Sequence, residues 1–191
     1  MTVNASVGPT LQFWYARLLT RYRRKARALE VFRAVVRDQP RHQRAWSCIG
    51  FLLAENEQFG PAAHAFERAR ALEPRDGPAN FNVGYMLQRL GRHEQALEYF
   101  DCALGLDRDM GRAWYASGIS LLRLGQAADA LTKFEEAARL QPSDPYPGYQ
   151  LAAIWHQRGD RDRLRLEYER VRKLDPQVAE RIRLEFGANP D

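Results

Sequence analysis

The chain has 191 residues, of which 45% are hydrophobic, and a formal net charge of +5. Its longest apolar run, from Leu11 to Leu19, contains Gln12 and Arg17 and is too short to span a bilayer. This run precedes a cluster of arginines, which is the reverse of the order found in a signal peptide. We therefore expect a soluble, cytoplasmic protein without a transmembrane segment.

The positive charge is concentrated at the start of the chain. Residues 1–44 contain ten basic and two acidic residues, which give this part a net charge of +8. The remaining residues contain 19 basic and 22 acidic side chains, so their net charge is −3. Of the 29 basic residues in the chain, 26 are arginines, a bias that we attribute to genome composition rather than to chemistry.

From Pro9 onward, five consecutive segments of about 34 residues repeat the same residue types at matching positions. The recurring aromatic residues are Phe32, Phe66, Phe100, Phe134 and Tyr168, and the recurring small residues are Ala16, Gly50, Gly84, Gly118 and Ala152. Apolar residues follow three- and four-residue spacings, which predict two amphipathic helices joined by a tight turn in each segment. After a disordered lead at residues 1–8, we place the repeats at about residues 9–42, 43–76, 77–110, 111–144 and 145–176.

The fourth segment indicates how each helix pair packs. Gly118 on the first helix, with Ala130 and Ala137 on the second, allows the two backbones to approach closely. Gly125 can take the left-handed conformation that ends the first helix. Pro142 ends the second helix, because it lacks an amide hydrogen.

Several segments depart from this pattern. Residues 22–24 replace the expected Leu-Gly turn in the first segment, and the turn glycine of the second segment is shifted to Gly60. In the third segment, Asn80 stands where a large residue is expected. We expect these changes to alter local helix ends rather than the stacking of the repeats.

The end of the chain predicts one additional helix. After Pro176, the apolar residues Val178, Ile182 and Phe186 follow a four-residue spacing, which gives one apolar stripe. We assign residues 177–191 to a capping helix that covers the last repeat, followed by a frayed tail from Gly187 onward.

The repeat resembles the tetratricopeptide repeat family, whose signature is W-x2-L-G-x2-Y, followed by A-x3-F, A and P. The second segment carries Trp46, Ile49, Gly50, Leu53, Ala62, Phe66, Ala69 and Pro74, and the fourth carries Trp114, Ser117, Gly118, Leu121, Ala130, Phe134, Ala137 and Pro142. The resemblance covers about residues 9–178. It implies an all-α, right-handed superhelical solenoid of five helix-turn-helix repeats with a C-terminal capping helix. It also implies a scaffold or adaptor that binds other proteins.

In this family the first helices of the repeats line a concave surface on which ligands usually lie. The residues expected on this surface are Arg44, Phe51, Phe81, Asn82, Tyr85, Gln88, Arg89, Arg112, Tyr115, Arg123 and Tyr149. Tyrosine and arginine are enriched in binding hot spots, so the expected partner is a peptide or helix with apolar and acidic residues. In an alternative interpretation, Phe51 and Phe81 only fill the seam between neighbouring first helices.

One known binding mode of the family is not expected here. Some members bind the C-terminal carboxylate of chaperones through a clamp of five positions, of which Asn82 and Arg112 match two. Ser47, Phe51 and Ala116 occupy the other three positions, so we predict that the clamp is absent. Bacterial secretion-type chaperones, which combine such repeats with an apolar groove, stay an alternative in kind.

The basic first repeat suggests two further functions. Trp14, Tyr15 and the following arginines form a basic, aromatic segment that could contact nucleic acid or an anionic surface, although a solvated end repeat is the simpler interpretation. Self-association through an uncovered first repeat, with Phe13 and Trp14 exposed, is the other alternative. We regard nucleic acid as the less favoured partner.

The sequence predicts neither an enzyme nor a bound metal or cofactor. The four histidines fall at unrelated repeat positions, and no catalytic triad, metal-ligand or phosphate-loop spacing occurs. Cys48 and Cys102 also occupy different repeat positions and suggest no disulfide. We expect Cys48, near the groove, to be a half-buried and unreactive thiol.

Overall fold

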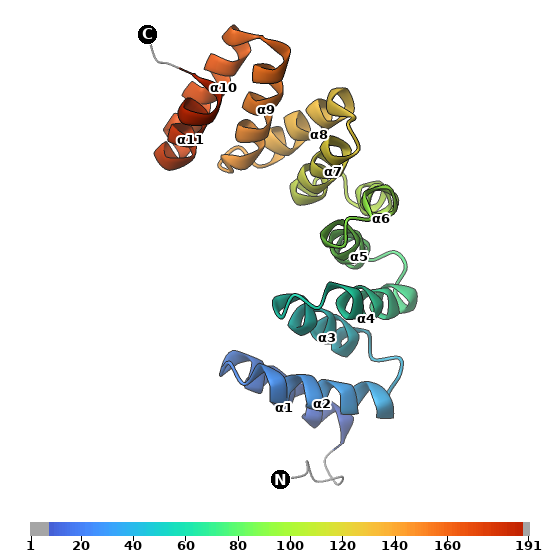
Figure 1. Ribbon diagram of the computed structural model, residues 1–191. Coiled ribbons are helices and arrows are strands. Elements are labelled where there is room, and N and C mark those ends of the chain that lie inside the picture. Colours follow the sequence, from blue (N-terminus) through green and yellow to red (C-terminus); the bar gives the residue numbers. More distant parts are fainter. Residues whose placement is uncertain (1–7, 189–191) are drawn as a thin grey trace. The chain divides into compact units, whose positions relative to one another are not determined.

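The computed structural model describes residues 8–188, which form eleven α-helices and no strand (Figure 1). The helices are α1 (Pro9–Arg21), α2 (Lys25–Asp38), α3 (Gln43–Glu55), α4 (Phe59–Leu72), α5 (Gly77–Arg89), α6 (His93–Leu106), α7 (Gly111–Arg123), α8 (Ala127–Leu140), α9 (Tyr146–Arg158), α10 (Arg161–Leu174) and α11 (Pro176–Phe186). They form five helical hairpins and a final single helix, so the expected all-α repeat fold is confirmed. Most of the predicted disordered lead and the end of the predicted tail lie outside the described residues.

The chain divides into two compact units, one ending at Leu106 and the other beginning at Asp107. In the first unit, α2 packs on α3 and α4 packs on α5, so three hairpins stack in chain order. In the second unit, α8 packs on α9, and α11 packs on both α9 and α10. None of the described helices is both long and apolar enough to cross a membrane.

In the three middle hairpins, a glycine of the first helix lies directly against an aromatic ring of the second. The pairs are Gly50 with Phe66, Gly84 with Phe100, and Gly118 with Phe134. A methyl group on any of these glycines would lie within 2.8 Å of a ring carbon, whereas carbon atoms pack best at about 3.5–4.0 Å. The sequence suggested that glycine meets alanine at this contact, but the aromatic ring occupies the space that the glycine leaves.

The turn inside each hairpin contains one residue in the left-handed conformation, and these residues are 34 positions apart. They are Arg23, Glu57, Gly91, Gly125 and Gly159. The expected shift of the second turn to Gly60 is wrong, because Glu57 takes the left-handed conformation with φ of 57° and Gly60 lies in the first turn of α4. A residue with a Cβ atom costs roughly 1–2 kcal/mol in this conformation, so the first two turns are strained.

Asn80 performs the same local role as the tryptophans of neighbouring repeats. The indole nitrogens of Trp46 and Trp114 donate to backbone carbonyls six residues earlier, at 2.9 and 2.8 Å. The Asn80 amide donates to the carbonyl of Pro74, also six residues earlier, at 3.1 Å, and to that of Asp76 at 2.9 Å. Asn80 is buried, so these hydrogen bonds satisfy an amide that would otherwise destabilise the core.

The two neighbouring aromatic residues of α1 have opposite environments. Phe13 is buried, with its ring centroid 5.7 Å from that of Phe32 and 4.7 Å from that of His42. Trp14 is exposed. The expectation that Phe13 is exposed is therefore wrong, because it lies on the side of α1 that faces the rest of its hairpin.

Helix α11 closes the second unit. Its residues Val178, Ala179 and Ile182 are buried. At its start, the Asp175 carboxylate accepts hydrogen bonds from the backbone amides of Gln177 and Val178, at 2.9 and 3.1 Å. This side chain satisfies two amide groups that have no partner within the helix.

Candidate partner-binding surface

A pocket of about 360 Å³ opens between α1 and α3 in the first unit. Phe32 and Leu52, both buried, contribute apolar atoms to it. Phe51 also lines it, with 53% of its surface exposed. The Phe51 ring meets the buried ring of Phe66 edge to face, with centroids 5.0 Å apart, so its position is supported from below. The pocket is therefore large enough for one apolar side chain of a partner and is lined by side chains that could hold it.

The rim of this pocket is basic. Arg17 and Arg21 reach it from α1, and Glu55 from α3. The Glu55 carboxylate already pairs with the Lys25 ammonium group, 3.2 Å away. The two arginines therefore leave a net positive rim, which favours a ligand with a carboxylate next to an apolar side chain.

Cys48 lines the same pocket and is half-buried. Burial raises the pKa of its thiol above the ordinary value of 9.0, although the nearby Arg17 acts in the opposite direction. At neutral pH the thiol is therefore protonated, which makes it a weak nucleophile.

Sequence reasoning did not include Arg17, Thr20 and Arg21 among the groove residues, although all three line the pocket. The reason is that the first repeat departs from the family signature and was left out of the groove register. A signal was present, because Arg17 and Arg21 lie 34 residues before Phe51 and Glu55. Carrying the repeat register one unit further back would have found both arginines.

Helix α5 carries a stacked aromatic pair. The rings of Phe81 and Tyr85 are nearly parallel, with an interplanar angle of 8° and centroids 5.9 Å apart. Phe81 is half-buried and its ring centroid lies 5.7 Å from that of Phe100, whereas Tyr85 is exposed. Phe81 thus packs inside its hairpin and also supports the exposed ring of Tyr85.

The other candidate residues of α5 have different surroundings. Asn82 and Gln88 are half-buried. Arg89 is exposed, and its guanidinium lies over the ring of Phe59, at the start of α4, 4.1 Å from the ring centroid. Arg89 therefore already has an aromatic partner within the chain.

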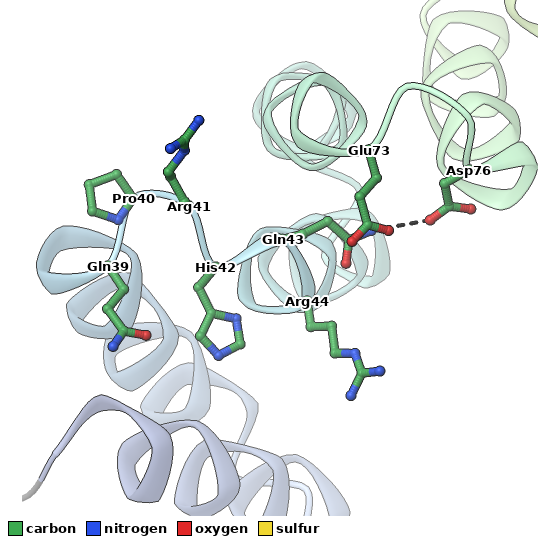
Figure 2. A pocket seen from close by; sticks show the side chains of 8 residues that line it. All are labelled: Gln39, Pro40, Arg41, His42, Gln43, Arg44, Glu73 and Asp76. Atoms are coloured by element: carbon green, nitrogen blue, oxygen red, sulfur yellow. Dashed lines mark hydrogen bonds between the residues drawn. The ribbon is translucent and has the colours of Figure 1, made fainter.

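Arg44 lies at a second pocket, of about 830 Å³, formed by the loops at the ends of the first two hairpins. Figure 2 shows Gln43 reaching towards Asp76, to which its amide donates a hydrogen bond of 3.2 Å. In the same view Arg41 and Arg44 point away from this pair in opposite directions. Because the pocket is mostly lined by polar side chains, it lacks the apolar lining of the pocket beside Phe51.

The candidate residues of α7 belong to the second unit. Arg112 and Arg123 are exposed near opposite ends of this helix. Tyr115 is half-buried, with its ring centroid 5.6 Å from that of Phe134. Burial raises the pKa of its phenol, and a hydrogen bond with Gln150 acts in the opposite direction. Tyr115 therefore exposes only part of its ring.

Tyr149 is engaged by the capping helix. Its hydroxyl donates to the Glu185 carboxylate, and the guanidinium of Arg181 donates to the same hydroxyl at 3.2 Å. The Arg181 guanidinium also lies 4.7 Å from the centroid of the Tyr149 ring, and the Phe186 ring centroid is 5.5 Å away. Burial, followed by the Glu185 carboxylate, raises the pKa of the Tyr149 phenol. The ring and hydroxyl of Tyr149 thus contact α11, a contact that the sequence reasoning did not include.

The structure separates the predicted site residues into local groups. In the first unit, Phe51 lines the pocket between α1 and α3, Arg44 lines the loop pocket, and Phe81 and Tyr85 form the stacked pair. Within residues 8–188, no group of three or more His, Cys, Asp or Glu side chains could hold a metal ion.

Comparison with protein families supports the repeat assignment. A family model described as "Tetratricopeptide repeat" matches residues 49–110 and 87–145, which together span just over half of the chain. The chain belongs to the tetratricopeptide repeat family. The resemblance inferred from the sequence is thereby confirmed. No curated protein sequence matches this chain.

Several solved structures of tetratricopeptide repeat proteins have a similar fold. MamA from Desulfovibrio magneticus RS-1 has a TM-score of 0.82 at 17% identity, over 88% of this chain and 96% of that one. YrrB, described as a protein with an unusual peptide-binding site, has a TM-score of 0.76 at 19% identity, over 91% and 90% of the two chains. PilW, described as a type IV pilus biogenesis factor, has a TM-score of 0.78 at 19% identity, over 94% and 86%. Tetratricopeptide repeat proteins in general mediate protein–protein interactions and are typically non-catalytic.

Proposed function

We propose that this protein is a non-catalytic scaffold or adaptor that binds a peptide or helix of a partner protein, with α1, α3 and α5 as the main contact helices. The observation that carries the proposal is the pocket between α1 and α3, where the exposed ring of Phe51 stands next to a net basic rim. An apolar side chain of the partner would enter this pocket, and a neighbouring carboxylate would pair with Arg17 or Arg21.

The repeat register supports extending this surface to α5. Arg17, Phe51 and Tyr85 occupy the same position in three successive first helices, 34 residues apart. Side chains at one repeat position project from the same side of their helices, so the stacked pair of Phe81 and Tyr85 would offer a second apolar contact. Because these rings are held by packing, ordering them on binding would cost little conformational entropy.

The likeness to YrrB, which is described as having a peptide-binding site, is consistent with this mode of binding. Residues Arg112, Tyr115 and Arg123 of the second unit stay candidates for a longer ligand. Tyr149 is a weaker candidate, because its hydroxyl and ring are used by α11. The cytoplasmic location and the absence of catalysis stay predictions.

Selection of phage-displayed random peptides on the purified protein tests the proposal. We expect the selected peptides to share a large apolar residue next to Asp or Glu. Their affinity, measured by fluorescence anisotropy, should fall about tenfold or more in Phe51→Ala, as at a typical hot spot. The double variant Arg17→Gln, Arg21→Gln should also bind more weakly and show less salt dependence than the wild type.

Leu166→Ala serves as the matched control, because Leu166 is an exposed apolar residue outside the proposed surface. Circular dichroism should show equal helix content in all variants. The arginine variant guards against a folding defect in Phe51→Ala, since both arginines are exposed. Selected peptides that bind the wild type, Phe51→Ala and the arginine variant equally well would contradict the proposal.

A further inference from the structure

A second face of α1 exposes a continuous row of large apolar and aromatic side chains. It consists of Leu11, Trp14, Tyr15 and Leu18 of α1 and Tyr22 directly after it, each between 46% and 70% exposed. Their spacing places them within an arc of about 100° on the helix, because each residue advances the helix by about 100°. We call these five residues the outer face of α1.

The outer face is distinct from the parts of α1 that the protein already uses. Phe13, Ala16 and Leu19 are buried within the first unit. Arg17 and Arg21 line the pocket between α1 and α3. Because the buried residues hold α1 in place, the helix can present its outer face without leaving the hairpin, so this inference does not depend on the proposed peptide site.

The surroundings of the outer face are strongly basic. Residues 8–29 contain no acidic residue and six basic ones. Lys25 and Arg27 have carboxylate partners, Glu55 and Glu30. Arg21, Arg23 and Arg24 are exposed, and none of them forms an ion pair with another described residue. An occupant of this face therefore meets uncompensated positive charge beside apolar side chains.

We propose that the outer face of α1 docks on the surface of an anionic lipid bilayer. Leucine side chains would enter the boundary between headgroups and acyl chains, while the arginines would contact lipid phosphates. Trp14, Tyr15 and Tyr22 suit this boundary, because each combines an apolar ring with a polar group that can stay hydrated. A helix with one such face lies flat in the interface and does not cross the membrane.

The observed charges and side chains favour a bilayer over other occupants. A second copy packed symmetrically on this face would bring together two first repeats that each carry a net charge of +8. A nucleic acid would use the arginines, but it would leave Leu11 and Leu18 without an apolar contact. An anionic bilayer satisfies both the positive charge and the leucines.

Sedimentation with lipid vesicles tests the proposal on the full chain. We expect binding to vesicles of equal parts phosphatidylglycerol and phosphatidylcholine, weakening as salt is added, and little binding to phosphatidylcholine alone. The double variant Leu11→Ala, Leu18→Ala should lower the vesicle partition coefficient at least tenfold. The double variant Arg23→Asn, Arg24→Gln should lower it about 25-fold, or about fivefold for each arginine, and asparagine tolerates the left-handed backbone at position 23.

The matched control is Leu166→Ala, Leu184→Ala, which removes two leucines that are exposed to a similar degree in the second unit. It should bind anionic vesicles as the wild type does. The proposal is overturned by absence of sedimentation with anionic vesicles, by equal binding to phosphatidylcholine, or by equal effects of the two leucine pairs. It is also overturned if light scattering without lipid shows a dimer that Leu11→Ala, Leu18→Ala dissociates, because a second copy would then occupy the face.

Discussion

Replacing Gly118 by alanine would place a methyl group against a ring that has little room to move. The added carbon would lie 2.6, 2.8 and 2.9 Å from three carbons of the Phe134 ring. Phe134 is fully buried, so other core side chains surround it. To restore ordinary carbon contacts of about 3.5–4.0 Å, the ring and the added methyl group must separate by roughly 1 Å.

The expected net loss of stability is about 2 kcal/mol. Overpacking of a core typically costs about 1–3 kcal/mol, and three close ring carbons put this site at the upper end of that range. Alanine recovers about 1 kcal/mol, because it has a higher helix propensity than glycine. The hairpin should still form, since Ala16 and Ala152 occupy the same repeat position in the first and last hairpins.

Urea denaturation followed by circular dichroism measures this effect. Gly105→Ala is the matched control, because Gly105 also lies in a helix but has no atom within 4 Å of the added methyl group. We expect that control to be unchanged or up to about 1 kcal/mol more stable. Adding Phe134→Leu to Gly118→Ala should cost less than Phe134→Leu alone, because the smaller side chain relieves the clash. Equal or greater stability of Gly118→Ala than of the wild type would refute the steric reasoning.

Four further predictions address single residues. Glu57→Gly should stabilise the chain by about 0.5–1 kcal/mol in a urea titration, because it relieves a left-handed residue, and a loss of stability would contradict this explanation. Asn80→Ala should destabilise the chain by about 1–3 kcal/mol, because buried carbonyls lose their donor; an effect below 0.5 kcal/mol would show that water replaces it. Burial raises the pKa of Glu167 above 4.5, so the folded state binds more protons than the unfolded state between these values, and wild-type stability falls as pH rises through this window. Glu167→Gln should lack that fall, which paired titrations at several pH values would detect, and parallel curves would argue against a raised pKa. Finally, maleimide should label the exposed Cys102 about tenfold faster than Cys48, as followed by mass spectrometry, and equal rates would mean that the Cys48 thiol is neither shielded nor raised in pKa.

Several features of the fold could be predicted because they depend on local spacing. The recurrence of Phe66, Phe100 and Phe134 with a preceding glycine identifies both helices of each repeat and the contact between them. Packing of this kind joins residues about 16 positions apart, so one repeat contains all the information that it needs. The exposed position of Phe51 was likewise inferred from helix periodicity alone, although the pocket beside it was not.

Other features were missed because residue identity does not reveal conformation. Glu57 gives no sign of a left-handed turn, since that conformation is associated with glycine, yet the surrounding hairpin imposes it. Asn80 appeared to be a misfit in the signature, but its short amide reaches the same backbone carbonyl position that the tryptophan side chains reach. These cases depend on how three-dimensional packing constrains a residue, which its chemical type alone does not specify.

The sequence by itself determined the helical hairpins, their number and the family, because repeated apolar spacing specifies which side of each helix must be buried. Only the tertiary structure decided which surfaces are free. It placed Arg17 and Arg21 beside Phe51, buried Phe13 while leaving Trp14 exposed, and brought α11 onto Tyr149. The physical reason is that exposure depends on contacts between helices distant in the sequence, whereas helix formation depends mainly on neighbours within a few turns.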